Sequence, residues 1–293
     1  HWNADGLREQ TPFLRLYLHQ HDIDIALISE THLKPYHRLT FPNYAVFRND
    51  RLDRRKGGTA IIIKSCLPFQ HIPTPPLQSL EATVVKILTP TSPLTIVSIY
   101  RHPPHPLLRA DLLALRQLGE DIFIAGDLNA KHPDWHSRVS NPAGRHLQLL
   151  LDQLELEATA STEPTFYPKH GGLPDVLDIA LHTGFHFLDG PAPLHELHSD
   201  HLPVNIVVQH HHLQHSLPPM VTMETDWPAY RRHVLEELEF LPHPDTPEAA
   251  EDAIGQLTAL LLTAYHSHSR GTTHPSTGTN TDSATRLLLA MKD

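Results

Sequence analysis

DIFIAGDLNAKHPDW (residues 121–135) carries the strongest structural signal in this chain. Its apolar beginning predicts a buried strand over 122–125, followed by Asp127 and Asn129. Side chains two residues apart on an extended segment point to the same side, so this carboxylate and carboxamide could orient and deprotonate a water molecule beside a phosphate. An Asx-rich turn after a buried strand explains the same letters. Taken alone, the segment favours that simpler interpretation.

The sequence on both sides of this segment predicts a mixed α/β domain from Thr11 to about Val208. Most of its apolar runs are nearly continuous, which is typical of strands covered on both faces. Besides 122–125, strands are expected at 23–29, 59–63, 83–88, 94–100, 177–181 and 204–208. Helices are expected at 107–118, at 142–157 and from Thr11 onward, with Pro12 as the first residue of the last.

The composition changes after Gln209, so we assign residues 1–209 to the α/β domain. The remaining chain is polar at first, then amphipathic with helical spacing, and finally rich in Ser, Thr and Gly. We expect a hinge at 210–225, a helical connector at 226–266 with helices at about 228–240 and 247–265, and a mostly flexible segment at 267–293. The two late helices have no expected strand partners.

Composition limits the class of protein. A single cysteine, Cys66, excludes an intramolecular disulfide framework, and no apolar run approaches the roughly 20 residues that span a bilayer. We therefore expect an intracellular protein without a membrane segment. The formal net charge of -10 argues against a nucleic-acid partner, because phosphate binding depends on cations. A basic stretch between Arg48 and Lys56 makes that objection a modest one.

Polar side chains also stand at the ends of four other apolar runs. Glu30 follows the first predicted strand, where a carboxylate can bind a hard divalent cation, although a solvated acid is the commoner explanation. Asp200 and His201 directly precede the last predicted strand, where they suit metal binding and phosphate contact, or belong to an ordinary loop. Asp178 begins one strand, and Tyr100 ends another.

Six segments together resemble the exonuclease-endonuclease-phosphatase superfamily in their content and order. They are WNADGL at 2–7, ISETHL at 28–33, SIYRHP at 98–103, AGDLNAKHPDW at 125–135, LDIAL at 177–181 and HSDHLPV at 198–204. The chain is most similar to the apurinic-like endonuclease domain of jockey-type non-LTR retrotransposons. This resemblance implies a four-layer α/β sandwich, in which helices flank two packed mixed β-sheets, with a small C-terminal helical extension.

The resemblance also implies a magnesium-dependent endonuclease that nicks target DNA and leaves a 3′-hydroxyl primer for target-primed reverse transcription. In this family pattern Glu30 binds Mg2+, for which Mn2+ can substitute, and Asn3 and Asp200 help to shape the metal site. Asp127 acts on the nucleophilic water, and Asn129 orients it. The scissile phosphate is contacted by His201, whose ring is held by Asp178, and is approached by Tyr100.

The expected partners are a double-stranded DNA target and the reverse transcriptase domain of a parent polyprotein, since no polymerase motif occurs before Asp293. Access to the nucleus is expected if the chain is active. Candidate DNA contacts are Arg48, Arg51, Arg54, Arg55, Lys56, Trp135 and Thr165. A solvated hairpin tip explains the basic stretch equally well. For Trp135, burial beneath the loop is the favoured alternative to base stacking.

Two other functions fit the same fold. The substrate could instead be abasic DNA, RNA or a phosphoinositide, or the chain could be an inactive retroelement relic that only binds nucleic acid. The family's first strand would largely precede Trp2, so we expect a truncated strand whose exposed edge weakens the metal site. The presence of all six segments argues against the relic.

Overall fold

The computed structural model describes residues 1–52, 56–89, 92–209, 221–241, 244 and 247–273 of the chain. These residues fall into two compact units, one within 1–209 and the other within 221–273. The elements of the first unit, in chain order, are β1 (Trp2–Asn3), α1 (Leu7–Gln20), β2 (Ile25–Ser29), β3 (Tyr44–Asn49), β4 (Thr59–Lys64), β5 (Phe69–Ile72), β6 (Leu80–Ile87), β7 (Leu94–Arg101), α2 (Arg109–Arg116), β8 (Asp121–Asp127), a 3-10 turn (Pro133–Trp135), α3 (Pro142–Leu154), β9 (Glu157–Ala160), β10 (Asp178–His182), β11 (His186–Pro193) and β12 (Val204–Gln209).

Two mixed β-sheets form the centre of this unit. The strand order is β1-β2-β4-β3 in the smaller sheet and β5-β6-β7-β8-β10-β9 in the larger one. β1 runs parallel to β2 and β7 runs parallel to β8, whereas β10 lies antiparallel to β8. β11 and β12 form a further antiparallel pair, and reciprocal main-chain hydrogen bonds of 2.8 Å join Val204 to His1 beside β1.

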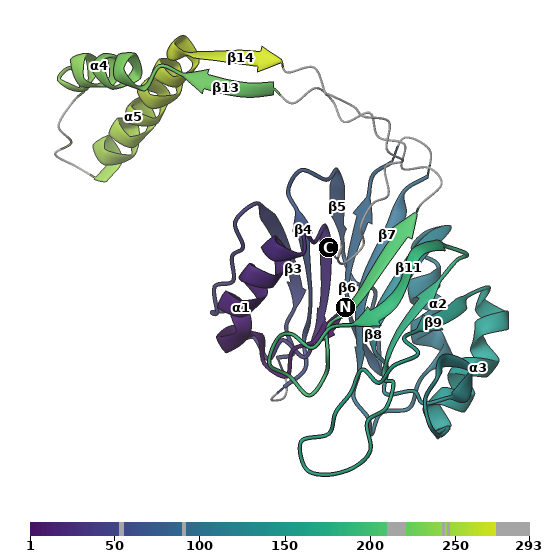
Figure 1. Ribbon diagram of the computed structural model, residues 1–293. Coiled ribbons are helices and arrows are strands. Elements are labelled where there is room, and N and C mark those ends of the chain that lie inside the picture. Colours follow the sequence, from purple (N-terminus) through teal and green to yellow (C-terminus); the bar gives the residue numbers. More distant parts are fainter. Residues whose placement is uncertain (53–55, 90–91, 210–220, 242–243, 245–246, 274–293) are drawn as a thin grey trace. The chain divides into compact units, whose positions relative to one another are not determined.

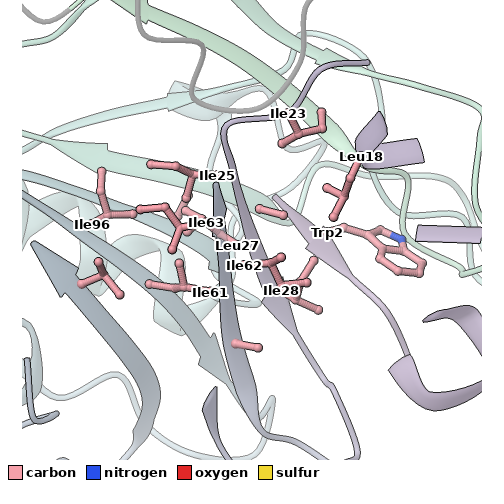
Figure 2. Packing of buried hydrophobic residues seen from close by; sticks show 14 of the residues in the cluster. Trp2, Leu18, Ile23, Ile25, Leu27, Ile28, Ile61, Ile62, Ile63 and Ile96 are labelled. Carbon is pink, nitrogen blue, oxygen red and sulfur yellow. The ribbon is translucent and has the colours of Figure 1, made fainter. Parts of the chain in front are cut away.

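Two hydrophobic cores hold the layers together. One includes Leu27 and Ile61 of the smaller sheet, Ile96 of the larger sheet and Leu18 of α1, so it fills the space around the smaller sheet (Figure 2). The other packs α2 and α3 against the larger sheet through residues such as Leu147. In Figure 1, α1 lies on one side of the sheets and α2 and α3 on the other. The predicted four-layer α/β sandwich is therefore confirmed.

All seven predicted strands are present, but the bounds of some elements differ from the prediction, and the structure contains further strands that were not predicted. α1 begins at Leu7 rather than Thr11, because Leu7 is already buried in the core, and Pro12 lies inside the helix. The Thr11 hydroxyl donates to the Leu7 carbonyl at 3.0 Å and so does not cap the helix start. α3 ends before Glu155, whose left-handed φ of 53° stops the helix before β9.

The strands that the sequence did not reveal are β3, β5, β9 and β11. β3, β5 and β9 lie at or next to sheet edges, where partial exposure interrupts the apolar runs that identify a covered strand. β11 is irregular, with register shifts along its pairing to β12. β1 contains only two residues, yet it pairs in parallel register with the end of β2.

The second unit combines two helices with a strand pair. Its elements are β13 (Val221–Thr225), α4 (Trp227–Leu238), α5 (Pro247–His268) and β14 (Ser269–Thr273). Both predicted helices are present, but β13 and β14 pair antiparallel, so the expected absence of strands here was wrong. β14 also occupies the start of the segment expected to be flexible. Most of the predicted hinge (210–220) and the rest of the predicted flexible segment (274–293) lie outside the described residues. None of the helices in the described part of the chain has the length and apolar character required to cross a membrane.

Candidate active site

A row of three buried polar residues crosses the larger sheet at one end of its central strands. The register pairs Asp127 of β8 with Tyr100 of β7 on one side and with Asp178 of β10 on the other. Side chains in register on neighbouring strands share a face of the sheet. Pairing between distant segments thus brings together three residues that the sequence placed only at separate strand ends.

Asn3, the last residue of β1, connects this row to the smaller sheet. Its side-chain nitrogen donates to Asp127 Oδ2 at 3.0 Å and to Glu30 Oε1 at 3.1 Å. An amide carries two hydrogens, so one Asn3 side chain can serve both carboxylates. The short β1 strand positions this amide by pairing Asn3 with Ser29, the residue before Glu30.

Asp178 and His201 form the second connection in the site. Asp178 Oδ2 lies 2.8 Å from His201 Nδ1, as the family resemblance implied, and His201 Nε2 faces Asp127 Oδ2 at 3.6 Å. The other oxygen of Asp178 lies 3.1 Å from His1 Nδ1, and the His1 ring also contacts Ser29 Oγ at 3.1 Å. Asp178 therefore holds two buried imidazoles, of which only His201 points toward Asp127.

The charges in this buried group depend on one another. Burial opposes protonation of His201, but the Asp178 and Asp127 carboxylates outweigh it and raise the pKa of His201 to about 9. Burial, together with the nearby Asp178 and Glu30 carboxylates, raises the pKa of Asp127 above its usual range. The pKa of Asp178 is lowered, because His201 and His1 outweigh its own burial. A cationic imidazole thus lies next to a carboxylate that accepts a proton more readily than usual.

A group of possible metal ligands lies beside Asn3. Within the part of the chain that the structure describes, Asp5, Glu30 and His32 form the group of acidic and imidazole side chains whose ligand atoms lie within 4.8 Å of one another. Burial would raise the pKa of Glu30, but hydrogen bonds from His32, Asn3 and Tyr100 lower it to about 2. Glu30 is therefore ionised at neutral pH. Two carboxylates close together match the oxygen ligands that Mg2+ prefers.

Asp200, predicted as a metal ligand, is outside this group. Its Oδ1 atom lies 3.3 Å from Ser199 Oγ and 3.8 Å from Lys169 Nζ. Its carboxylate nevertheless favours the protonated form of the neighbouring His201. The structure therefore places Asp200 at the edge of the site, and its role as a ligand remains a prediction.

Asn129 lies in the site, but not in the way that the sequence suggested. β8 ends at Asp127, and Asn129 has a left-handed φ of 49°, so the two side chains do not point to the same side of one extended strand as predicted. The Asn129 main-chain nitrogen donates to Asp127 Oδ1 at 2.9 Å, whereas its side-chain amide donates to the Arg101 carbonyl at 2.9 Å. The segment thus agrees with both interpretations, because a tight turn follows the buried strand and holds the Asp127 carboxylate in the candidate site.

Two arginines of the predicted DNA-contacting stretch have partners within the protein. Arg48 donates to the Lys34 and Pro35 carbonyls, and Arg51 pairs with Glu81 while its guanidinium carbon lies 5.8 Å from the centre of the Tyr100 ring. Both guanidinium groups thus have contacts within the protein, and their expected contact with a DNA backbone stays a prediction. Lys56 remains 68% exposed. Arg54 and Arg55 lie outside the described residues.

The other two candidates for DNA contact are buried. Trp135 is 1% exposed and donates its indole hydrogen to the Ala130 carbonyl at 2.8 Å. Thr165 is fully buried, and its hydroxyl accepts a hydrogen bond from the Leu177 main-chain nitrogen at 3.2 Å. Both side chains are packed inside the protein, so their expected contact with DNA stays a prediction without an exposed surface to support it. The packing interpretation of Trp135 agrees with this structure.

Several residues of the site escaped the sequence interpretation. Asp5 and His32 each follow a predicted site residue by two positions, in WNADGL and ISETHL, so their spacing from Asn3 and Glu30 was an available signal. Buried Arg101 donates to the Leu128 and Asn129 carbonyls at 2.6 and 3.0 Å and so supports the turn after β8. No local pattern marked this arginine.

The model of the Endonuclease/Exonuclease/phosphatase family matches residues 1–201. The chain belongs to this family. Membership confirms the predicted resemblance and makes the fold that of the family's nucleases and phosphatases.

Two curated relatives of this chain come from mobile elements. The chain is 34% identical over 214 residues to the RNA-directed DNA polymerase from mobile element jockey of Drosophila melanogaster, a match that covers 71% of this chain and 23% of the relative. It is 28% identical over 273 residues to a probable RNA-directed DNA polymerase from transposon X-element of the same species, covering 90% and 30%. The chain thus spans about a quarter of the length of these curated relatives.

Solved structures of the family share the fold. The endonuclease domain of TRAS1, a telomere-specific non-LTR retrotransposon, superimposes with a TM-score of 0.57 at 22% identity over 72% of this chain and 97% of that domain. The catalytic domain of Xenopus laevis APE2 gives a TM-score of 0.55 at 18% identity over 71% and 90%. The matched portion of this chain corresponds in size to the first unit, which contains the site.

Proposed function

We propose that this member of the family is a Mg2+-dependent DNA endonuclease that nicks target DNA and leaves a 3′-hydroxyl primer for reverse transcription. The observation that carries the proposal is the Asn3 amide shared between Glu30 and Asp127. It joins a pair of possible metal-binding carboxylates, Asp5 and Glu30, to a buried carboxylate that faces His201. Such an arrangement fits the cleavage of a phosphodiester by water.

Each side chain has a chemical task in this proposal. Asp127 accepts a proton from the attacking water, and its raised pKa suits a base working near neutral pH. His201, held through Nδ1 by Asp178, donates from Nε2 toward the phosphate and offsets the charge that develops there. Glu30, Asp5 and Asn3 would hold Mg2+, which when bound supplies a Lewis acid for a phosphate oxygen.

Tyr100 and Asn129 support these groups. The Tyr100 hydroxyl hydrogen-bonds to Glu30, and burial together with the Glu30 and Asp127 carboxylates raises the pKa of Tyr100, so its phenol stays protonated beside the phosphate site. The Asn129 main-chain nitrogen holds one oxygen of Asp127, and this contact fixes the direction in which Asp127 meets a water. Asp200 adds negative charge near His201, which favours the protonated ring.

The mobile-element relatives support the choice of substrate and partner. Two of them are named as RNA-directed DNA polymerases, and this chain matches only 23% and 30% of their length. We propose that the chain acts on double-stranded DNA beside the reverse transcriptase domain of a parent polyprotein, in the nucleus. Reverse transcription needs a free 3′-hydroxyl. Hydrolysis that breaks the bond between the phosphorus and the 3′-oxygen would supply it.

A comparison of substrates tests this function. Equal amounts of protein with Mg2+ should be given an intact supercoiled plasmid, a duplex with one abasic site, a single-stranded RNA and a phosphoinositide. We expect the intact DNA to be cleaved fastest and a DNA polymerase to extend the nicked product without end repair. A clear preference for abasic DNA, RNA or the lipid headgroup would contradict the proposal. DNA binding without cleavage would instead identify an inactive relic.

A further inference from the structure

Two lysines from different loops meet at the same carboxylate beside the metal-ligand group. Lys56, in the loop before β4, places its Nζ atom 3.4 Å from Asp5 Oδ1. Lys169, in the loop between β9 and β10, places its Nζ atom 2.5 Å from Asp5 Oδ2 and 3.8 Å from Asp200 Oδ1. The two ammonium groups therefore meet at Asp5, a member of the metal-ligand group.

Both lysines are accessible to a large ligand. The side chain of Lys56 is 68% exposed and that of Lys169 is 49% exposed. Exposed ion pairs add little to stability, so the pairing with Asp5 is easily exchanged for another anion. Arg48 and Arg51 differ in this respect, because their guanidinium groups contact main-chain carbonyls or a half-buried glutamate.

The charge around the site makes such cations necessary for a polyanionic substrate. Five carboxylates, from Asp5, Glu30, Asp127, Asp178 and Asp200, surround the place where a phosphate must bind, and the whole chain has a formal net charge of -10. DNA phosphates are repelled by these groups unless a metal ion and basic side chains offset them. A lysine on a flexible stem can move several ångströms to reach a phosphate.

We propose that Lys56 and Lys169 form a phosphate clamp that binds the DNA backbone next to the scissile phosphate. Both lysines are tied to Asp5 until that carboxylate binds a divalent cation, and they then turn to the DNA. The clamp couples DNA binding to metal binding through a single carboxylate. This inference rests on the proposed function, since it needs a nucleic-acid substrate.

The salt dependence of DNA binding tests the clamp. The variants Lys56→Gln, Lys169→Gln and their combination should be made in an Asp127→Asn background, so that a labelled duplex stays intact in Mg2+. Affinity is then measured by fluorescence anisotropy from about 50 to about 200 mM KCl. The control is Lys86→Gln. In the strand register Lys86 lies opposite Thr95, near the end of β7 that is distant from Tyr100.

In Mg2+ we expect each substitution to reduce the slope of log affinity against log salt by about 0.9, and the double variant by about 1.8. The loss should be uniform across DNA sequences, because phosphates carry no base information. In EDTA the loss should be smaller, since Asp5 then neutralises both lysines. Lys86→Gln should behave like the parent.

Unchanged slopes in both single variants would overturn the clamp and leave the lysines as counter-ions of Asp5. Equal losses in Mg2+ and EDTA would overturn the exchange between Asp5 and DNA. If wild-type protein nicks plasmid but the lysine variants keep the salt slope of their parent, only the clamp is rejected. If wild-type protein neither binds nor nicks DNA, the proposed function itself is rejected.

Discussion

Replacing Asp127 by asparagine is expected to reduce Mg2+-dependent plasmid nicking by about 10²–10⁴-fold, the contribution typical of a positioned general base. The substitution keeps the shape of the side chain but removes its ability to accept a proton from water. It also turns one end of the side chain into a donor, which would face the donating Asn3 amide. Initial rates of open-circle formation, with thermal unfolding as a check of the fold, measure the effect.

The matched control is Asp134→Asn. Asp134 lies on the short turn that follows the same strand, its side chain is 57% exposed, and it contacts His132 rather than the site. This variant should nick at the wild-type rate. If Asp127→Asn nicked as fast as Asp134→Asn, Asp127 could not be the base.

The second large effect concerns the pair formed by Asp178 and His201. Removing a donor aimed at developing charge typically lowers the rate by about 10²–10³-fold, which we expect for His201→Gln. Asp178→Asn should lower it by about 10–100-fold, because it removes the carboxylate that orients the ring and stabilises its charge. Both rates come from the same plasmid assay at saturating Mg2+.

The double variant separates a positioning role from an independent one. Asp178 acts through His201, so we expect the double variant to be about as slow as His201→Gln alone. Multiplied losses would show that Asp178 contributes by another route, such as its contact with His1. His182→Gln serves as a control, because His182 is a buried histidine on the same strand that bonds Thr159 far from Asp127.

The sequence revealed the parts of the fold in which local pattern and burial coincide. β2, β4 and β7 are almost entirely buried, so their apolar runs stand out without any tertiary information. Edge strands such as β5 and β9 have only four residues each, and most of those residues are partly or fully exposed. Their pairing is fixed by neighbouring strands, which no local window contains.

The site divides in a similar way. Asp127, Glu30 and His201 were identified because they stand at the ends of predicted strands inside segments that resemble the family. The direction of Asn129 could not be inferred, since it depends on a left-handed turn held by Arg101. Asp127 and Asn129 thus stand in the same segment but make different contacts, and the sequence alone does not distinguish them.

The contacts of the basic side chains were the feature least predictable from the sequence. A run of basic residues predicts a positive surface only if the side chains lack partners, and Arg51 instead pairs with Glu81, which is 30 positions away. Lys169 attracted no attention as an isolated residue. It reaches Asp5 across 164 positions, because loops from opposite ends of the domain meet at the site.

The metal requirement of plasmid nicking tests the proposed site most directly. Wild-type protein stripped of metal by EDTA should leave supercoiled plasmid intact, and addition of Mg2+ should restore open circles whose 3′ ends a DNA polymerase extends. This result follows if Glu30 and Asp5 hold the ion beside Asp127 and His201. Nicking that is equally fast in EDTA, or intact plasmid at every Mg2+ concentration, would contradict it.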